Sequence, residues 1–401
     1  MADPGALNIL CITTYEKGQE FMRECRRHGC GVFLLTAEKL RDADWPRECL
    51  DDTFYIPENL PLNDIVQAVT HLARTQKIDR IVALDEYDME TASTLREHLR
   101  IPGMGLTTMR YFRDKLAMRM RALDRHVRVP DFVPVFHHAD VRYYMEHVPG
   151  PWVLKPRQEA SAIGIRKIHT PEELWPVLEE LGGRQATYLL EKFVPGEVYH
   201  VDSVVSENQV VFANVSKYGK PPMNVAQGGG IFTTFTVPRG SDADGGLRQI
   251  NRELIGALGL VRGVSHAEFI QANSDHHFYF LECAARVGGA YINEMVEAAT
   301  DLNLWREWAR IEVAGGDGSY KLPPVREDYA GVILSLARQQ EPDTSAYNDP
   351  EIVLRIKRHH HAGLVLRSNE PRRVQLLLEN YAERFAEEFL AVAPPQAKPT
   401  A

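Results

Sequence analysis

Short apolar runs and amphipathic stretches alternate over the first hundred residues of the chain. The apolar runs at 7–14, 31–36 and 78–85 have the length of buried strands. The stretches at 16–28 and 62–76 have the spacing of helices. Because parallel strands need a crossover connection, this rhythm predicts an α/β domain with a parallel sheet at the front of the chain.

The loop after the first strand lacks the glycines of a dinucleotide-binding site. Residues 13–18 read TTYEKG and hold a single glycine, whereas the Rossmann fingerprint needs several. We therefore expect a Rossmann-like layout without dinucleotide binding. Asp85, Glu86 and Asp88 follow the third strand, where they either contact a ligand at the carboxyl edge of the sheet or cap the next helix.

After residue 110 the pattern changes to a mixed α+β unit, and the segment IPGMG at 101–105 marks the boundary. Strands are expected at 151–157, 187–194, 199–205 and 210–218, a hairpin at 266–282, and helices at 111–126, 171–182 and 242–259. From residue 321 on, the pattern predicts two strands, a helix at 370–390 and a disordered tail.

Two acidic residues stand on the strands of the expected hairpin. Positions pair across a hairpin when their numbers share a constant sum, so Glu268 faces Glu282 if the loop is odd in length and centred on Asp275. Two carboxylates on one face repel unless a cation lies between them, and Mg²⁺ prefers such oxygen ligands. Arg286 follows closely and suits an anionic transition state. The alternative is a solvated hairpin face with ordinary charges.

Two lysines and one strand end are candidate nucleotide contacts. Lys155 lies in the apolar strand WVLKP, where it either binds a phosphate or extends its amine to solvent. Ser161 and Gly164 follow in a loop whose backbone N–H groups suit phosphate. Lys115, taken alone, belongs to a basic, solvated helix face. The segment LLEKFVPGE at 189–197 either binds a nucleobase and ribose or is a plain hairpin.

Composition limits the class of partners. The 401 residues are 44% hydrophobic and 25% charged, which is typical of a soluble globular protein of two or three domains. A net charge of −9 argues against nucleic acid, and the absence of a long apolar run argues against a membrane span. The N-terminus has no signal-peptide pattern, so we expect a cytoplasmic protein. The basic run around His359–His361 favours a solvated edge strand over an anion contact.

Taken together, these segments resemble the ATP-grasp superfamily over nearly the whole chain. RDK at 113–115 and VLKP at 153–156 resemble its two nucleotide lysines, and EKFVPGE at 191–197 resembles its adenine and ribose hinge. HAEF and LECAAR resemble the segments that carry its two metal-binding acids. ALDEYD and IPGMG resemble the branch of carboxylate–amine ligases that join amino acids or peptides.

The resemblance implies an α/β (α+β) ATP-grasp fold with an N-terminal Rossmann-like pre-ATP-grasp domain. Four parts are expected: the pre-ATP-grasp domain at 1–108, a small lid at 109–190, a large catalytic part at 191–320, and a C-terminal α/β extension at 321–401.

The resemblance also implies roles for individual residues. ATP would be bound by Lys115, Lys155, Ser161, Gly164, Glu191, Lys192, Phe193, Val194 and Glu197. Mg²⁺, as one or two ions and with Mn²⁺ as an alternative, would be bound by Glu268 and Glu282, while Arg286 and Lys155 would be catalytic. Substrate choice would lie with Asp202, Lys217, Tyr218, the glycine loop at 228–230 and Gly288–Gly289.

One position departs from the family pattern. The commonest motif is Glu-x-Asn-x-Arg, and Ala284 stands here in place of the Asn, so one metal ligand is missing or replaced.

The implied activity is an ATP-dependent ligase that forms an amide between a small-molecule carboxylate and an amine through an acyl phosphate. The alternatives are phosphorylation of another acceptor, such as bicarbonate in biotin carboxylase relatives or a hydroxyl, and a nucleotide-binding module without catalysis. A homodimer is expected from the base rate for soluble oligomers.

Overall fold

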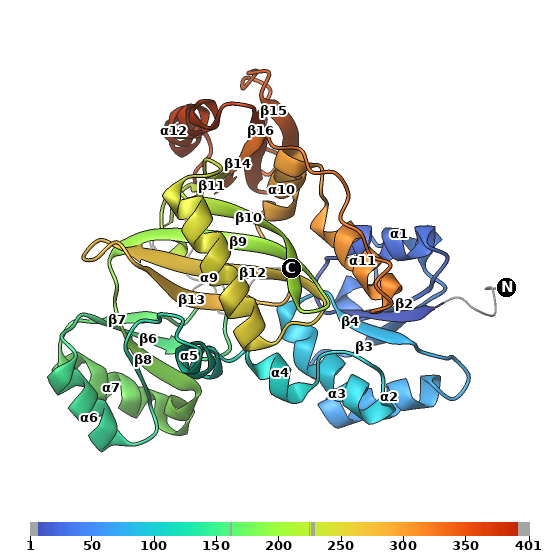
Figure 1. Cartoon of the computed structure of the whole chain (residues 1–401), viewed down its shortest axis with the longest axis horizontal. Helices are drawn as coiled ribbons and strands as arrows, with labels where there is room; N and C mark the ends of the chain where they lie inside the picture. Colours follow the sequence, from blue (N-terminus) through green and yellow to red (C-terminus); the bar gives the residue numbers. More distant parts are fainter. Residues whose placement is uncertain (1–6, 161–162, 224, 226–228, 392–401) are drawn as a thin grey trace.

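Three β-sheets organise the part of the chain that the computed structural model describes, which is residues 7–160, 163–223, 225 and 229–391. Figure 1 shows the front sheet on the right, a small sheet at the lower left, and a large sheet that crosses the centre and continues to the top. This mixed architecture of sheets and helices confirms the predicted fold class.

The front sheet is parallel, as the alternating pattern predicts, and its strand order is β3-β2-β1-β4. Its strands are β1 (Asn8–Thr13), β2 (Gly31–Ala37), β3 (Asp52–Ile56) and β4 (Arg80–Ala83), and its helices are α1 (Gln19–Arg27), α2 (Leu62–Leu72) and α3 (Met89–Leu99). The sequence pattern does not reveal β3, because its residues DTFYI are only partly buried and form no apolar run.

The small sheet is antiparallel and has the order β5-β8-β6-β7. It consists of β5 (Phe132–Pro134), β6 (Trp152–Pro156), β7 (Arg166–Ile168) and β8 (Tyr188–Lys192), with helices α6 (His138–His147) and α7 (Pro171–Leu181). Apolar side chains from both helices and from the sheet form one buried cluster, which holds this part together.

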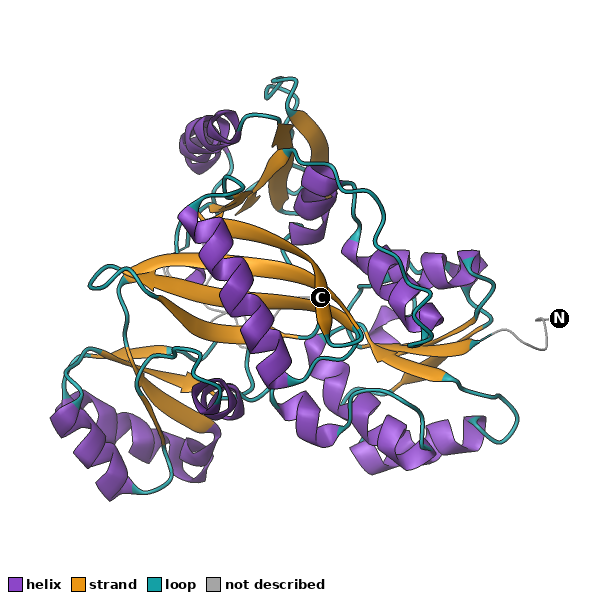
Figure 2. Ribbon diagram, in the orientation of Figure 1, coloured by secondary structure: helices purple, strands orange, loops and turns teal. Residues whose placement is uncertain are grey.

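The large sheet is antiparallel and has the order β13-β12-β9-β10-β11-β14-β16-β15. Its strands are β9 (Gly196–Ser206), β10 (Gln209–Tyr218), β11 (Phe232–Thr236), β12 (Gly263–Ala272), β13 (Phe278–Ala284), β14 (Tyr329–Leu336), β15 (Ile352–Arg358) and β16 (His361–Ser368). Its helices are α9 (Asp242–Leu258), α10 (Ile292–Thr300), α11 (Leu304–Ala314) and α12 (Pro371–Glu388). Figure 2 shows α9 lying across one face of this sheet.

The strands after residue 320 continue the large sheet. β14 pairs with β11, and β15 forms the outer edge. The edge strand predicted for the basic run is confirmed only in part: Arg358 and the basic residues before it lie on β15, whereas His359 and His360 form the turn and His361 begins β16. The strands before and after the predicted boundary at residue 320 therefore belong to the same sheet. The four-part division stays a prediction.

The helix expected at 111–126 is present but shorter, and a turn separates it from a preceding helix. The preceding helix, α4 (Leu106–Arg110), ends at Arg110, and α5 (Lys115–Asp124) begins after Asp114. The side chain of Asp114 caps α5 by accepting hydrogen bonds from the backbone N–H groups of Leu116 and Ala117 at 3.0 and 3.3 Å. The cap fixes Lys115 as the first residue of the helix.

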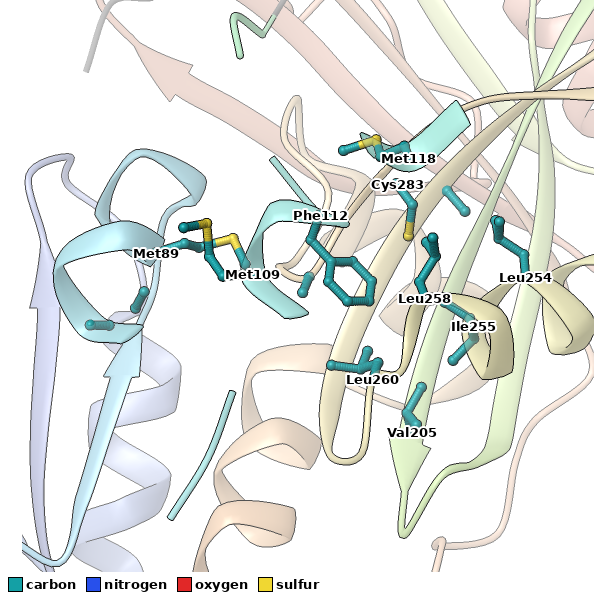
Figure 3. Packing of buried hydrophobic residues seen from close by; sticks show 14 of the residues in the cluster. Met89, Met109, Phe112, Met118, Val205, Leu254, Ile255, Leu258, Leu260 and Cys283 are labelled. Atoms are coloured by element: carbon teal, nitrogen blue, oxygen red, sulfur yellow. The ribbon is translucent and has the colours of Figure 1, made fainter. Parts of the chain in front are cut away.

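One apolar core joins the front sheet to the large sheet. Figure 3 shows Met89 of α3 next to Met109 of α4, with Phe112 between Met109 and Leu258 of α9. These side chains belong to a single buried cluster that also includes strands of both sheets. The two parts are therefore packed directly on each other. Among the helices of the described residues, none has the length and apolar character needed to cross a membrane.

Candidate active site

A cavity of about 610 Å³ lies between the small sheet and the large sheet, which is a usual size for a small-molecule site. The cavity is lined by nine of the residues predicted to bind ATP or metal or to be catalytic, namely Lys115, Lys155, Glu191, Lys192, Phe193, Val194, Glu268, Glu282 and Arg286. Tyr218 and Gly289, predicted to select the substrate, line it as well. Glu197 and Gly164 are not among its lining residues, although Ile163 and Ile165 on either side of Gly164 are. Ser161 lies outside the described residues.

The hairpin of β12 and β13 pairs Glu268 with Glu282, as predicted. The expected reason for this pairing is wrong, because Phe269 pairs with Phe280 and the loop is therefore not centred on Asp275. A β-bulge between the two pairs shifts the register by one residue and leaves Leu281 as the extra residue. The bulge thus brings the two acids opposite each other.

Both acids have polar partners inside the cavity. The hydroxyl of Tyr218 donates to Glu268 Oε1 at 2.8 Å, and Lys115 Nζ lies 2.7 Å from Glu282 Oε2. Burial works to raise the pKa of Glu268, but hydrogen bonds from His266 and Tyr218 outweigh it and lower this pKa. Glu268 therefore stays charged, and two adjacent carboxylates are a donor set that fits Mg²⁺.

Ala284 leaves the site without the third side-chain ligand of the commoner motif. It pairs with His266 at the start of the hairpin and carries no oxygen on its side chain. His266 is buried instead beside the acids, with Nε2 3.5 Å from Glu268 Oε1. Because side chains on a strand alternate between faces, a residue two positions before Glu268 shares its face; this spacing is the signal from which His266 could have been found.

Lys115 belongs to the cavity wall and not to a solvated helix face. Its side chain is buried, and Nζ donates to the carbonyl of Glu159 at 2.6 Å as well as reaching Glu282. Arg119, one turn further along α5, is fully buried and binds Glu191 Oε2 through Nε and Nη2 at 3.1 and 3.0 Å. Arg119 was missed, although its i, i+4 spacing from Lys115 places both on one face.

Lys155 lies in the cavity wall with a protein counter-ion. Its ammonium pairs with Glu191 Oε1, so the amine does not extend to solvent, and the phosphate contact stays a prediction. Burial lowers the pKa of Lys155 to about 8, although the Glu191 carboxylate opposes this shift. The carboxylate of Glu191, which the family resemblance assigns to ATP, is thus occupied by Lys155 and Arg119.

The predicted hinge is only partly in the cavity. The backbone N–H of Lys192 donates to Asp131 and that of Phe193 to Pro151, at 2.8 and 2.9 Å, which anchors this segment to the small sheet. Glu197 lies just outside, where it pairs with Lys217 at 2.5 Å. A ribose contact through Glu197 would compete with this ion pair.

Arg286 enters the cavity from the end of the hairpin and is held from the front sheet. Its Nε and Nη2 bind Glu86 Oε1 at 3.1 and 2.6 Å, and Nη1 donates to the carbonyl of Val287 at 2.9 Å. Glu86 is therefore neither a cap nor free for a ligand. Asp85 does act as a cap, because it accepts from the backbone N–H of Tyr87 at 3.0 Å.

A buried polar chain lies beneath Glu268. Asp202 is fully buried and binds the Nδ1 atoms of His200 and His266 at 2.6 and 2.8 Å, and His200 Nε2 contacts Thr234 Oγ1 at 2.7 Å. Asp202 was expected to select substrate, but both of its oxygens are engaged in this chain. The two histidines and Asp202 lie close enough to hold an ion, yet their mutual hydrogen bonds already satisfy them.

Comparison with known proteins agrees with this architecture, although no family model matches the chain. Over 270 residues it is 24% identical to the L-arginine-specific L-amino acid ligase of Bacillus subtilis, covering 66% of this chain and 64% of that protein, which is less than two thirds of the relative.

Solved structures match over nearly the full length. The L-amino acid ligase from Bacillus licheniformis has a TM-score of 0.76 at 16% identity, covering 97% of this chain and 99% of that chain. The N5-carboxyaminoimidazole synthetase from Staphylococcus aureus, complexed with ADP, has a TM-score of 0.72 at 17% identity, covering 94% and 96%. At these TM-scores and coverages the chain shares the overall fold of these two enzymes.

Proposed function

We propose that this chain is an ATP- and Mg²⁺-dependent ligase that joins a carboxylate to an amine through an acyl phosphate. The observation that carries the proposal is the facing pair Glu268 and Glu282 in one cavity with Lys115, Lys155 and Arg286. This chemistry needs positioning and charge neutralisation more than covalent help from the protein. The L-amino acid ligases among the similar proteins support amino acids as substrates.

Glu268 and Glu282 are the residues that would hold Mg²⁺, as one or two ions. The metal supplies neutralisation of negative charge on the phosphate oxygens. Lys155 has three N–H groups, so it can keep Glu191 as its partner and still donate to a phosphate. Lys115 can bind the phosphates from the other side, next to Glu282. The adenine ring would lie against the main chain of Lys192–Val194.

The reaction proceeds in two steps. An oxygen of the substrate carboxylate attacks the γ-phosphorus, and ADP leaves with the electrons of the broken bond. The amine nitrogen then attacks the acyl carbon, inorganic phosphate leaves, and the nitrogen loses a proton. Arg286 stabilises the transferred phosphoryl group and then the oxyanion. Apolar lining residues such as Val153, Ile163 and Leu281 exclude water that would hydrolyse the acyl phosphate.

The test is release of ADP and phosphate from ATP and Mg²⁺ with a panel of amino acids, singly and in pairs, with and without bicarbonate. We expect release that requires an amino acid pair, with a new amide detected by mass spectrometry. Release that depends on bicarbonate would instead indicate another acceptor. Tight Mg-ATP binding with no release would indicate a binding module. The homodimer and the cytoplasmic location stay predictions.

A matched pair of variants on the same hairpin tests the assigned metal site. Glu282→Gln keeps the size of the side chain and removes its charge, so we expect amide formation to fall by about 100-fold or more. Asp275→Asn, at the exposed tip of the hairpin, should change the rate by less than about twofold. Equal rates for Glu282→Gln and wild type would contradict the assignment.

A further inference from the structure

Glu86 lies where the front sheet, the cavity and the loop after β6 meet. It follows β4, is buried, and is 200 positions away in sequence from Arg286, its partner. Its second oxygen, Oε2, accepts from Arg113 Nη1 at 3.1 Å. Arg113 also donates to the carbonyl of Gln158 at 2.7 Å, so a single carboxylate links three parts of the chain.

The contacts of Arg286 leave a defined part of its guanidinium for a ligand. An arginine has five N–H donors in a rigid plane. Glu86 takes the donors on Nε and one on Nη2, and the carbonyl of Val287 takes one on Nη1. One N–H on each terminal nitrogen remains, and Arg286 lines the cavity. The hydrogen bonds from Nε and Nη2 to Glu86, together with the one from Nη1 to Val287, restrict rotation of the guanidinium plane.

The charges around Glu86 leave the site suited to an anion. Burial works to raise the pKa of Glu86, but Arg286 and Arg113 outweigh it and lower this pKa to about 2, so the carboxylate stays ionised. One negative charge thus faces two guanidinium groups; Asp85 and Glu282 also act on Arg286, but each has a lysine partner of its own, so positive charge remains on the two arginines. A negatively charged phosphoryl group or oxyanion can use that charge.

We propose that Glu86 is a positioning residue that orients the guanidinium of Arg286 toward the anionic groups of the reaction, so that the front sheet completes an active site built by the other two sheets. This inference rests on the proposed function, because it takes Arg286 as the group that stabilises the transition state. The competing explanation is an ion pair that only holds the parts of the chain together.

A double-mutant cycle separates the two explanations. Glu86→Gln keeps the shape but loses the charge, and we expect kcat for ADP release to fall by about 100-fold, as for a misplaced catalytic group, with the Kd for Mg-ATP within about threefold. In an Arg286→Ala background, Glu86→Gln should have no further effect on kcat, because Glu86 acts only through Arg286. Lys17→Met, which breaks the Lys17–Asp85 pair at the same sheet edge, should leave kcat unchanged.

Two results would overturn the inference. One is an equal loss of kcat from Glu86→Gln with and without Arg286. The other is a loss that follows the fraction of unfolded protein in thermal melts. If Arg286→Ala does not fold, Arg286→Lys takes its place in the cycle, since it keeps the charge and loses the fork. ADP release without amide formation would contradict the proposed ligase activity. The double-mutant cycle would still test the role of Glu86, because it is measured by the rate of ADP release.

Discussion

The pKa values of the buried carboxyl groups at the edge of the front sheet depend on whether a guanidinium group contacts them. Arg286 and Arg113 overcome burial and lower the pKa of Glu86 to about 2. Two residues later, burial raises the pKa of Asp88 from its ordinary value of 3.8 to about 7. The backbone N–H of Thr14, which donates to Asp88 at 2.8 Å, opposes that shift but does not cancel it. Neighbouring acids in one loop therefore have opposite effects on stability.

We expect Asp88→Asn to stabilise the protein at pH 8 and to leave its stability nearly unchanged at pH 4. The folded state keeps the Asp88 proton up to about pH 7, whereas the unfolded state loses it near 3.8. The folded state binds more protons in this window, so the stability of the wild type falls as the pH rises through it. The size of this pKa shift sets an upper limit of about 4 kcal/mol on the gain in unfolding free energy that Asp88→Asn gives at pH 8.

Urea unfolding of both proteins at the two pH values measures this difference. Asn keeps an oxygen that can accept from Thr14, which makes the substitution nearly isosteric. A wild type that is as stable as Asp88→Asn at pH 8 would show that Asp88 ionises at no cost in the folded state.

At the scale of elements, the sequence predicts those strands and helices that are determined by residues close together in the chain. Apolar periodicity predicts β1, β2 and β4. The constant-sum rule pairs Glu268 with Glu282 only for an odd loop centred on Asp275, and the hairpin does not have such a loop. The bulge after Glu268, which brings the two acids opposite each other, is a one-residue shift in register that no such rule predicts. Likewise, no local pattern joins Glu86 to Arg286 or Arg119 to Glu191; these pairs exist only once separate elements pack together.

The loop after the hairpin has little room above the buried polar chain. A Cβ on Gly288 would lie 3.0 Å from both Asp202 Oδ1 and His266 Nδ1, whereas a Cβ on Gly289 would meet nothing within 4 Å. We therefore expect Gly288→Ala to destabilise the protein by about 1–3 kcal/mol, since it crowds a hydrogen-bonded network. Gly289→Ala should stay within about 0.5 kcal/mol of wild type. Denaturant midpoints of the two variants give the comparison, and equal midpoints would mean that the loop moves aside freely.

At the scale of the whole molecule, the continuity of the large sheet decides which segments fold together. β14 pairs with β11, and the apolar side chains of β14, β16 and α12 form one buried cluster with Ile231. The family resemblance implies a C-terminal extension after residue 320. Strands far apart in sequence give no local sign that they share a sheet. The shared sheet joins the C-terminal strands to the strands that carry Glu268 and Glu282.

A chain that ends at residue 320 should therefore fail to fold stably. It would lose β14, β15, β16 and α12, leaving β11 as a new edge with unpaired backbone groups beside exposed apolar side chains. Exposed edges of this kind promote aggregation. A chain that ends at residue 391 keeps every described element and is the matched control. Size-exclusion chromatography and thermal unfolding should show aggregated or unfolded protein for the first chain and a cooperative transition for the second. A soluble 320-residue chain with a wild-type transition would instead mean that residues 1–320 form an independent unit, and that the C-terminal strands only extend it.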